Sequence, residues 1–202
     1  MNTKAQIRQQ MLRRREQMDE TEYQQRCSAI HQCVVSHPTF RRAAWIHTYC
    51  SFNREVDTWR IIRSAFAMGK RVMVPVVQQS ELRHIEIFPD QPFQSDAFGI
   101  PVPQFDHPPQ WLDAAAILQP SDLVLVPLLA FDPDLYRLGY GKGYYDRFLA
   151  RVRGVKMGIA FAFQRRESPL PRESHDVPLD LVVTDQAVYT RQQEHPCIGD
   201  PF

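Results

Sequence analysis

The chain has almost no net charge, no long apolar stretch and no internal repeat or low-complexity block. Its 202 residues carry 24 Lys and Arg against 23 Asp and Glu, a formal net charge of +1. No overall electrostatic field therefore recruits nucleic acid or an anionic membrane. No apolar run approaches the roughly 18 residues that a membrane span needs. These absences argue against a nucleic-acid-binding protein and against a membrane protein, so any anion site must be local.

Paired cysteine motifs are also absent. No two of the four cysteines form a Cys-x-x-Cys pair: Cys27, Cys33, Cys50 and Cys197. Neither a zinc ribbon nor a dithiol redox motif is therefore indicated. The polar N-terminus, residues 1–10, lacks the apolar core of a signal peptide. Free thiols in a reducing compartment are the simplest interpretation, and we expect a cytoplasmic protein.

Composition and periodicity predict one globular α/β domain. Hydrophobic residues make up 44% and charged residues 23% of the chain, as in ordinary globular proteins, and the length suits a single domain at 1–190 followed by a polar C-terminal tail at 191–202. Helical spacing or caps predict helices at 4–18, 19–37, 57–68 and 144–153. Apolar runs predict strands at 43–50, 71–77 (broken near Pro75), 82–88, 122–127, 155–161 and 181–184. Residues 89–120 are expected to be mostly loop, with one short helix near Leu112. The alternation predicts a three-layer, Rossmann-like fold: a largely parallel open sheet with helices on both faces.

The most informative segment is residues 137–146, Arg-Leu-Gly-Tyr-Gly-Lys-Gly-Tyr-Tyr-Asp. Its alternating glycines suit a loop whose backbone approaches a ligand closely. Bare N–H groups, the Arg137 and Lys142 cations and a following helix N-terminus together suit an anion. Asp146 offers a hard oxygen ligand for a phosphate-bound Mg²⁺. We interpret the segment as a nucleotide-phosphate loop.

The segment differs from the common phosphate motifs. A P-loop requires Ser or Thr after its lysine, whereas Gly143 follows Lys142. A dinucleotide fingerprint requires its third glycine one residue later. The alternative is a glycine-rich turn that only joins a strand to a helix, and the charged residues around the glycines favour the phosphate interpretation.

Helical spacing sorts the residues of the first two helices. Lys4 and Arg8 are four residues apart and share a face, whereas the Arg residues at 13–15 are expected to form a solvated face. In the second helix, Cys27 belongs to an apolar stripe with Tyr23, Ile30 and Val34. We therefore expect Cys27 to be a buried apolar side chain rather than a nucleophile.

With these residues in view, the sequence resembles the 5-formyltetrahydrofolate cyclo-ligase family, also called methenyltetrahydrofolate synthetases, from about Lys4 to Asp185. Its strongest element is Pro-Leu-Leu-Ala-Phe-Asp at 127–132 followed by residues 137–147. Weaker elements occur in the family's order: Lys4-x-x-x-Arg8, Glu55-Val-Asp-Thr58, residues 69–75, Leu170-Pro171, His175-Asp176 and Leu179-Asp180. The resemblance implies conversion of 5-formyltetrahydrofolate to 5,10-methenyltetrahydrofolate with ATP and Mg²⁺, giving ADP and phosphate.

The resemblance also implies a set of site residues. It assigns catalytic roles to Arg137 and Lys142, and Mg²⁺ binding, direct or through water, to Asp146 and Asp176. It places ATP against Lys4, Arg8, Arg137, Leu138, Gly139, Tyr140, Gly141, Lys142, Gly143, Tyr144 and Tyr145. It places the folate against Cys50, Phe52, Glu55, Tyr140, Gly141, Lys142, Gly143 and Tyr144. The implied partners are ATP and 5-formyltetrahydrofolate, with or without a polyglutamate tail, and we expect a monomer without nucleic-acid or membrane partners.

Each of these assignments has a plainer structural alternative. Lys4 and Arg8 are also typical of ordinary surface charge, and Asp176 of a turn before Pro178. Glu55 is also compatible with a solvated loop. Phe52 and Tyr144 suit either stacking on the pterin or the core.

Two positions depart from the family pattern. Leu135 stands where the family usually has glycine, and Val102 where a glutamate is common. Neither lies among the proposed phosphate ligands, so these departures bear on loop geometry more than on activity.

The chemistry is compatible with the residues present. A formamide oxygen is a poor leaving group, and phosphorylation converts it into a good one, after which a neighbouring folate nitrogen closes the ring. Such catalysis is mostly positioning and electrostatics. Three other functions use the same features: a sugar-phosphate or coenzyme-A enzyme that does not need Lys4 or Arg8, an ATP-binding regulator without folate turnover, and nucleic-acid binding through residues 13–15, which the small net charge disfavours.

Overall fold

The computed structural model describes residues 3–191 and 194–196, and its centre is a sheet of eight strands in the order β12-β11-β10-β9-β6-β1-β2-β3. Neighbouring strands from β10 to β2 pair in parallel, whereas β3, β11 and β12 pair antiparallel at the two edges. In sheet order the strands are Glu194–Pro196, Ala187–Thr190, Leu181–Val183, Val155–Ile159, Leu123–Val126, Trp45–His47, Arg71–Gln78 and Glu81–Ile87. The prediction of a largely parallel sheet is confirmed.

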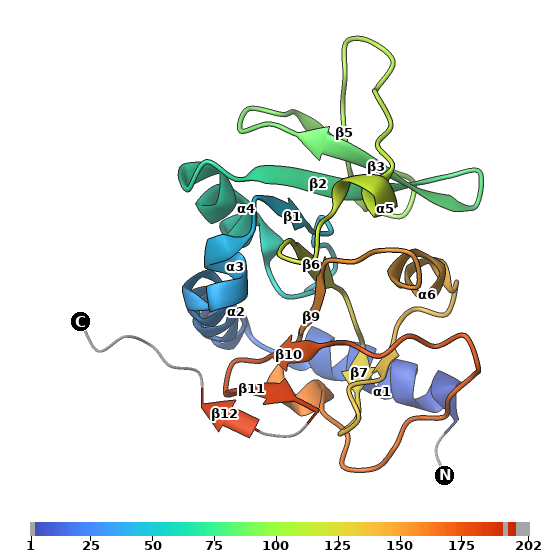
Figure 1. Cartoon of the computed structure of the whole chain (residues 1–202). Coiled ribbons are helices and arrows are strands. Elements are labelled where there is room, and N and C mark those ends of the chain that lie inside the picture. Colours follow the sequence, from blue (N-terminus) through green and yellow to red (C-terminus); the bar gives the residue numbers. More distant parts are fainter. Residues whose placement is uncertain (1–2, 192–193, 197–202) are drawn as a thin grey trace.

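Helices cover both faces of the sheet (Figure 1). α2 (Glu20–Ser36), α3 (Pro38–Arg42) and α4 (Thr58–Ala67) pack on one face, around a core that includes Ile30 and Ile61. α5 (Ala114–Ile117) and α6 (Tyr144–Leu149) pack on the other face, around Leu118 and Phe148. The three-layer α/β prediction is therefore confirmed.

A further helix, α1 (Lys4–Gln17), lies outside this three-layer arrangement. It contacts the small antiparallel sheet formed by β7 (Ala130–Phe131) and β8 (Arg137–Leu138). Figure 1 shows α1, in blue, running past β7 at the base of the molecule.

The predicted helix starts agree with the structure. The Thr3 hydroxyl accepts a hydrogen bond from the Gln6 amide in a reciprocal capping box, and Asp19 accepts one from the Glu22 amide. Asp57 caps α4 in the same way, through the Trp59 amide. After α2, Pro38 occupies the first turn of α3, where a missing N–H costs nothing, so the proline opens a helix that we did not predict.

Two predicted elements are much shorter in the structure, and the predicted break at Pro75 was wrong. β1 ends at His47 because Thr58 binds the following segment: its hydroxyl donates to the Tyr49 carbonyl and accepts from the Ser51 amide. α6 has six residues, fewer than the ten from 144 to 153. β2 runs unbroken through Pro75, because its pairing with β1 ends at Met73 and no N–H is required on that side afterwards.

Several strands of two to four residues were not predicted, because so short a segment has little periodicity unless it lies in a continuous apolar run. They include β7, β8 and β11, and the hairpin of β4 (Phe93–Ser95) and β5 (Pro101–Pro103) within 89–120. The helix expected near Leu112 is α5, which begins two residues later. Of the expected tail at 191–202, residues 194–196 form β12, whereas 192–193 and 197–202, with Cys197, lie outside the described residues. Within the described part, no helix is long and apolar enough to cross a membrane.

A buried histidine pair links β1 to β3. His47 Nε2 lies 3.0 Å from His84 Nδ1, and both rings pack against Phe148. Burial lowers the pKa of His47 well below its usual range and that of His84 to about 4; the Asp113 carboxylate opposes the shift at His84, and Arg151 adds to it. Both rings are therefore neutral in the folded protein at pH 7.

We predict that this pair makes folding stability depend on pH. Unfolded histidine takes up a proton near pH 6.5, so the unfolded chain binds more protons below that pH and stability falls as the pH decreases towards 4. One pKa unit corresponds to about 1.4 kcal/mol, so His84 alone should lower the free energy of unfolding by about 2 kcal/mol between pH 6.5 and 5. Urea titrations should show a smaller pH dependence for His84→Gln than for the wild type. Equal dependence would contradict this account.

Candidate active site

The site lies where two neighbouring strands send their connections in opposite directions. β1 pairs with β6, yet the chain crosses from β1 to β2 on one side and from β6 to β9 on the other. Ligands in such sheets bind in the crevice beyond the carboxyl ends at this switch point. The segments leaving that edge are residues 48–57 and 127–143. The first contains Cys50, Phe52 and Glu55 of the predicted folate site, and the second contains most of the predicted phosphate loop.

The approach to the glycine loop differs from our expectation. The loop leaves β8 of the small sheet, not β6 directly. α1 anchors this sheet: Ile7 and Met11 pack against Leu129, Ala130 and Leu138. The helix that bears Lys4 and Arg8 is thereby fixed against the loop.

The turn between β7 and β8 explains the first departure from the family pattern. Leu135 adopts a left-handed conformation with φ +62°, which glycine reaches without strain. The strain costs roughly 1–2 kcal/mol, but the Leu135 side chain is buried in the core. The carboxylate of Asp132 also holds the turn, because its Oδ1 accepts from the Asp134 and Tyr136 amides. The turn therefore forms with leucine at this position.

At two positions of the glycine loop, a side chain would be strained by the backbone conformation and crowded by a neighbouring guanidinium. Gly141 has φ +101°, and a Cβ there would lie 3.0 Å from Arg8 Nη2. Gly143 has φ +67°, and its Cβ would lie 3.1 Å from Arg147 Nη1. Arg8 Nε donates to the Gly139 carbonyl over 2.8 Å, so this guanidinium lies against the backbone of the loop. This packing of a cation on bare backbone suits an anion site better than a simple connector.

Two cations at the site are paired with carboxylates. The buried Arg137 guanidinium donates to Asp146 Oδ1 over 2.9 Å and to the Val177 carbonyl over 3.0 Å. Burial lowers the pKa of Arg137, and Asp146 opposes that shift. Lys4 Nζ lies 2.8 Å from Glu173 Oε1 and 3.4 Å from Asp176 Oδ2. Lys4 is thus held by carboxylates of residues 173–176 and Arg8 by the backbone of the loop, whereas Lys142 is exposed.

The two predicted metal ligands, Asp146 and Asp176, could supply only part of the coordination shell of a metal ion. Asp146 and Asp176 both act electrostatically on Arg137, so both carboxylates lie near its guanidinium. Among the described residues, no group of three or more His, Cys, Asp or Glu side chains is placed to hold a metal ion. An ion that arrives with phosphates usually needs only one or two carboxylates, and these two therefore fit a nucleotide-bound Mg²⁺. Asp176 also has the alternative turn role, because its Oδ2 accepts from the Glu173 amide.

The predicted folate segment contains a buried carboxylate. Glu55 is only 5% exposed, so the solvated-loop alternative was wrong. Tyr140 Oη donates to Glu55 Oε1 over 3.0 Å, and the Phe52 amide donates to Oε2 over 3.3 Å. Burial raises the pKa of Glu55, whereas the Arg15 charge, the Phe52 amide and the Tyr140 hydroxyl oppose that rise.

Aromatic rings and a thiol complete this side of the site. The Phe52 ring stacks on Tyr140 at a centroid distance of 6.2 Å. Cys50 is buried, and burial raises its pKa to about 12, so it is a neutral thiol and not a nucleophile. The Arg147 guanidinium lies 5.3 Å above the half-buried Tyr144 ring. Cys27 is buried, as predicted, and burial raises the pKa of its thiol, so it is neutral too.

Arg15 is the site residue that sequence reasoning missed. We expected it on a solvated face with Arg13 and Arg14; these two are exposed, but Arg15 is only 2% exposed. The signal was present in the spacing, because Ile7, Met11, Arg15 and Met18 recur at intervals of four, four and three residues and form the buried face of this region.

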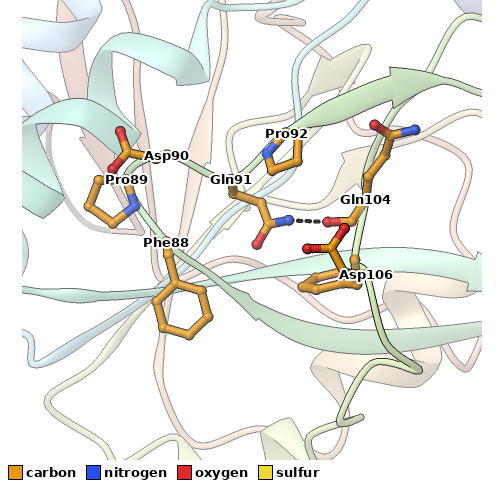
Figure 2. Close-up of a pocket in the computed structure, with 8 residues that line it drawn as sticks. Phe88, Pro89, Asp90, Gln91, Pro92, Gln104 and Asp106 are labelled. Carbon is orange, nitrogen blue, oxygen red and sulfur yellow. Dashed lines mark hydrogen bonds between the residues drawn. The ribbon is translucent and has the colours of Figure 1, made fainter.

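A hollow lies away from the glycine loop, beside the β4–β5 hairpin. It encloses about 350 Å³ between residues 88–92 and 104–106. Figure 2 shows the Gln91 side chain reaching the Gln104 carbonyl across it. None of the predicted site residues lines it. The glycine loop, where cations, carboxylates and bare backbone converge, is the candidate active site.

Comparison with known proteins gives consistent matches. The model of the 5-formyltetrahydrofolate cyclo-ligase family matches residues 1–185. A 5-formyltetrahydrofolate cyclo-ligase of Haemophilus influenzae is 31% identical over 192 residues, which cover 91% of this chain and 100% of the relative. The Escherichia coli K12 enzyme of that name is 32% identical over 164 residues, covering 77% and 86%. The solution structure of Aquifex aeolicus 5,10-methenyltetrahydrofolate synthetase superposes with a TM-score of 0.79 at 30% identity, covering 98% of this chain and 97% of that one.

Proposed function

Because this chain belongs to the 5-formyltetrahydrofolate cyclo-ligase family, we propose that its glycine loop and residues 50–55 hold ATP and 5-formyltetrahydrofolate side by side. The enzyme closes 5-formyltetrahydrofolate to 5,10-methenyltetrahydrofolate and uses ATP as its co-substrate. The hydrogen bond from Tyr140 to Glu55 is the observation on which the placement depends, since it joins the phosphate loop to the folate segment.

The reaction that this arrangement favours has two steps. The formyl oxygen attacks the γ-phosphorus of ATP, and the bond to ADP breaks. The neighbouring nitrogen, N10, then attacks the formyl carbon and loses its proton, and phosphate leaves with the former formyl oxygen. Positive charge at the phosphates assists the first step, because negative charge shifts towards ADP as the bond breaks. Lys142 and Arg137 are the cations that we assign to this role.

ATP binding is assigned to α1 and the loop together. Arg8 lies against the loop of residues 137–145, and Lys4, one turn earlier on α1, lies against Glu173 and Asp176. Here the bare backbone at Gly141 and Gly143 lets N–H groups approach phosphate oxygens. Tyr145 adds a buried hydroxyl without a hydrogen-bond partner among the described residues. A nucleotide or its bound water would satisfy that hydroxyl.

Folate binding is assigned to the buried carboxylate and the rings around it. An ionised Glu55 accepts N–H groups of the pterin, the same geometry in which it now accepts from Phe52 and Tyr140. The rings of Phe52, Tyr140 and Tyr144 offer flat apolar faces for stacking. Cys50 borders this region from the β1 side as an uncharged thiol.

Asp146 and Asp176 are assigned to a Mg²⁺ ion that arrives with ATP. Such an ion neutralises phosphate charge and fixes the orientation of the phosphates. We predict that Asp176→Asn raises the Mg²⁺ concentration needed for half-maximal activity, because an amide oxygen is a weaker ligand for a hard cation. Asp146→Asn should do the same and also lower the melting temperature, because it weakens the partner of the buried Arg137.

Magnesium titrations of both variants beside thermal melts test this assignment. If the wild-type protein keeps its normal turnover in excess EDTA, the reaction does not require a metal ion and this assignment is wrong. A normal magnesium dependence in both variants would move the ion to other ligands.

The compartment, oligomeric state and remaining partners are also proposals. Buried free thiols at Cys27 and Cys50 are compatible with a reducing cytoplasm. We propose a cytoplasmic monomer that acts on 5-formyltetrahydrofolate with or without a polyglutamate tail and that has no nucleic-acid or membrane partner.

The proposed function is tested by mixing the purified protein with Mg-ATP and 5-formyltetrahydrofolate. The near-ultraviolet absorbance of the methenyl product should rise and should match the ADP released. As controls, this absorbance should not rise without ATP, and it should not rise with folates that lack the formyl group. ADP release without methenyl product would instead favour an ATP-binding regulator.

A further inference from the structure

Arg15 is a cation inside an otherwise apolar face. It is 2% exposed and lies in the same stripe as Ile7 and Met11. Burying a charge is unfavourable unless it is paired and hydrogen-bonded. Its Nε is buried without a hydrogen-bond partner among the described residues. An apolar side chain would fill this position without that penalty, so packing alone does not account for an arginine here.

The bonds that Arg15 does make lead into the folate segment. Its Nη2 donates to the Asn53 carbonyl over 2.7 Å and to Tyr140 Oη over 3.0 Å. The Tyr140 hydroxyl has one proton, and with Arg15 on its lone pair that proton is directed to Glu55 Oε1, 3.0 Å away. Arg15 thus donates a hydrogen bond to Tyr140, and Tyr140 donates one to the Glu55 carboxylate.

Arg15 is also the cation that acts on Glu55. Several ionisable groups face Glu55: Arg15 from α1, Tyr23 from α2, Tyr49 after β1, Tyr140 from the glycine loop and Tyr145 from α6. The adjacent Arg54 points away, with its guanidinium on the carbonyls of Met18 and Asp19. Burial raises the pKa of Glu55, and the Arg15 charge is the largest opposing influence. Without Arg15, a buried Glu55 would more readily take up a proton.

We propose that Arg15 is a positioning residue of the folate site, which keeps Glu55 ionised and, through Tyr140, directed to accept N–H groups of the pterin ring of 5-formyltetrahydrofolate. This inference depends on the proposed function, since it assigns Glu55 to folate recognition. Arg15 itself contacts neither substrate nor phosphate in this account.

The test is the pH dependence of kcat/KM for 5-formyltetrahydrofolate at saturating Mg-ATP. Arg15→Met removes the charge and keeps an apolar side chain of similar length. Its acidic limb should move to higher pH by about one unit or more, the usual effect of losing an opposite charge. At high pH, where Glu55 is ionised in both proteins, the difference in kcat/KM between Arg15→Met and the wild type should become smaller. The KM for ATP should stay at the wild-type value.

Three further variants separate charge from packing. Arg15→Lys restores a cation and should return the limb towards wild type, whereas Arg15→Gln keeps a donor without charge and should not. Arg13→Met makes the control substitution on the exposed face of the same helix and should leave the profile unchanged. In a Glu55→Gln background, Arg15→Met should shift no limb. If Arg15→Met does not fold, the comparison of the Gln and Lys variants decides.

Two results would overturn the inference. The first is an unchanged acidic limb in folded Arg15→Met or Arg15→Gln. The second is an equal loss at every pH that also raises the KM for ATP, which would indicate a purely structural role. Absence of methenyl product from the wild type would instead refute the proposed function, so the two failures are distinguishable.

Discussion

Replacing Gly141 or Gly143 by Ala is expected to lower kcat/KM by about 10²- to 10³-fold, the usual loss when preorganised electrostatic contacts are disturbed. Both residues have positive φ, and an added Cβ would meet the Arg8 or Arg147 guanidinium at 3.0–3.1 Å. Either the guanidinium or the strained loop backbone must then shift, and we expect the arrangement of cations and N–H groups around the phosphates to be disturbed. Stability should fall by only about 1–2 kcal/mol, the strain of a left-handed alanine.

Gly69 supplies a matched control for this experiment. Its φ is +69°, nearly that of Gly143, and an added Cβ there meets nothing within 4 Å. Gly69→Ala should therefore lose similar stability and keep its activity. Steady-state kinetics beside thermal melts for all three variants make the comparison. Near-normal turnover in Gly141→Ala and Gly143→Ala would reduce the loop to a connector between β8 and α6.

Replacing Lys142 by Ala is expected to have the second large effect, a fall in kcat of about 10²- to 10³-fold. Lys142 is exposed in the middle of the loop, and we assign its charge to the phosphates, where charge develops during transfer. Exposed substitutions usually change stability by only about 0.5 kcal/mol, so the melting temperature should stay near that of the wild type.

Lys142→Arg is the companion variant, because it keeps the charge but changes its geometry. We expect it to retain more activity than Lys142→Ala and less than the wild type. Single-turnover kinetics separate phosphoryl transfer from product release. If Lys142→Ala lowers only the affinity for ATP and leaves kcat intact, the residue binds the nucleotide and does not assist the transfer.

The sequence predicted the fold because its central elements are strongly patterned. β6 is entirely buried and reads as a continuous apolar run, and α2 presents a regular stripe of Cys27, Ile30 and Val34. The short strands were not predictable, because pairing with neighbours far away in the sequence defines them. The length of β1 depended on Thr58, which binds the segment after the strand.

The candidate site was predictable only where the residues that indicate its chemistry lie close together in the sequence. The glycines and charges of 137–146 indicated a phosphate loop, and their assigned roles stay predictions. Arg15 was missed because a triplet of arginines resembles a solvated face, and its burial depends on the turn at Asn53 and on Tyr140, 125 residues away. Likewise, the burial of Glu55 follows from α1 and the glycine loop closing over its segment.

The central claim is that ATP is used at this loop to phosphorylate the formyl oxygen. Synthesising 5-formyltetrahydrofolate with ¹⁸O in the formyl group, and following that label by mass spectrometry during turnover with unlabelled ATP, tests it most directly. The account predicts that each phosphate released carries the ¹⁸O atom and that ADP carries none. Methenyl product formed with unlabelled phosphate would show that the formyl oxygen leaves by another route, and would contradict the account.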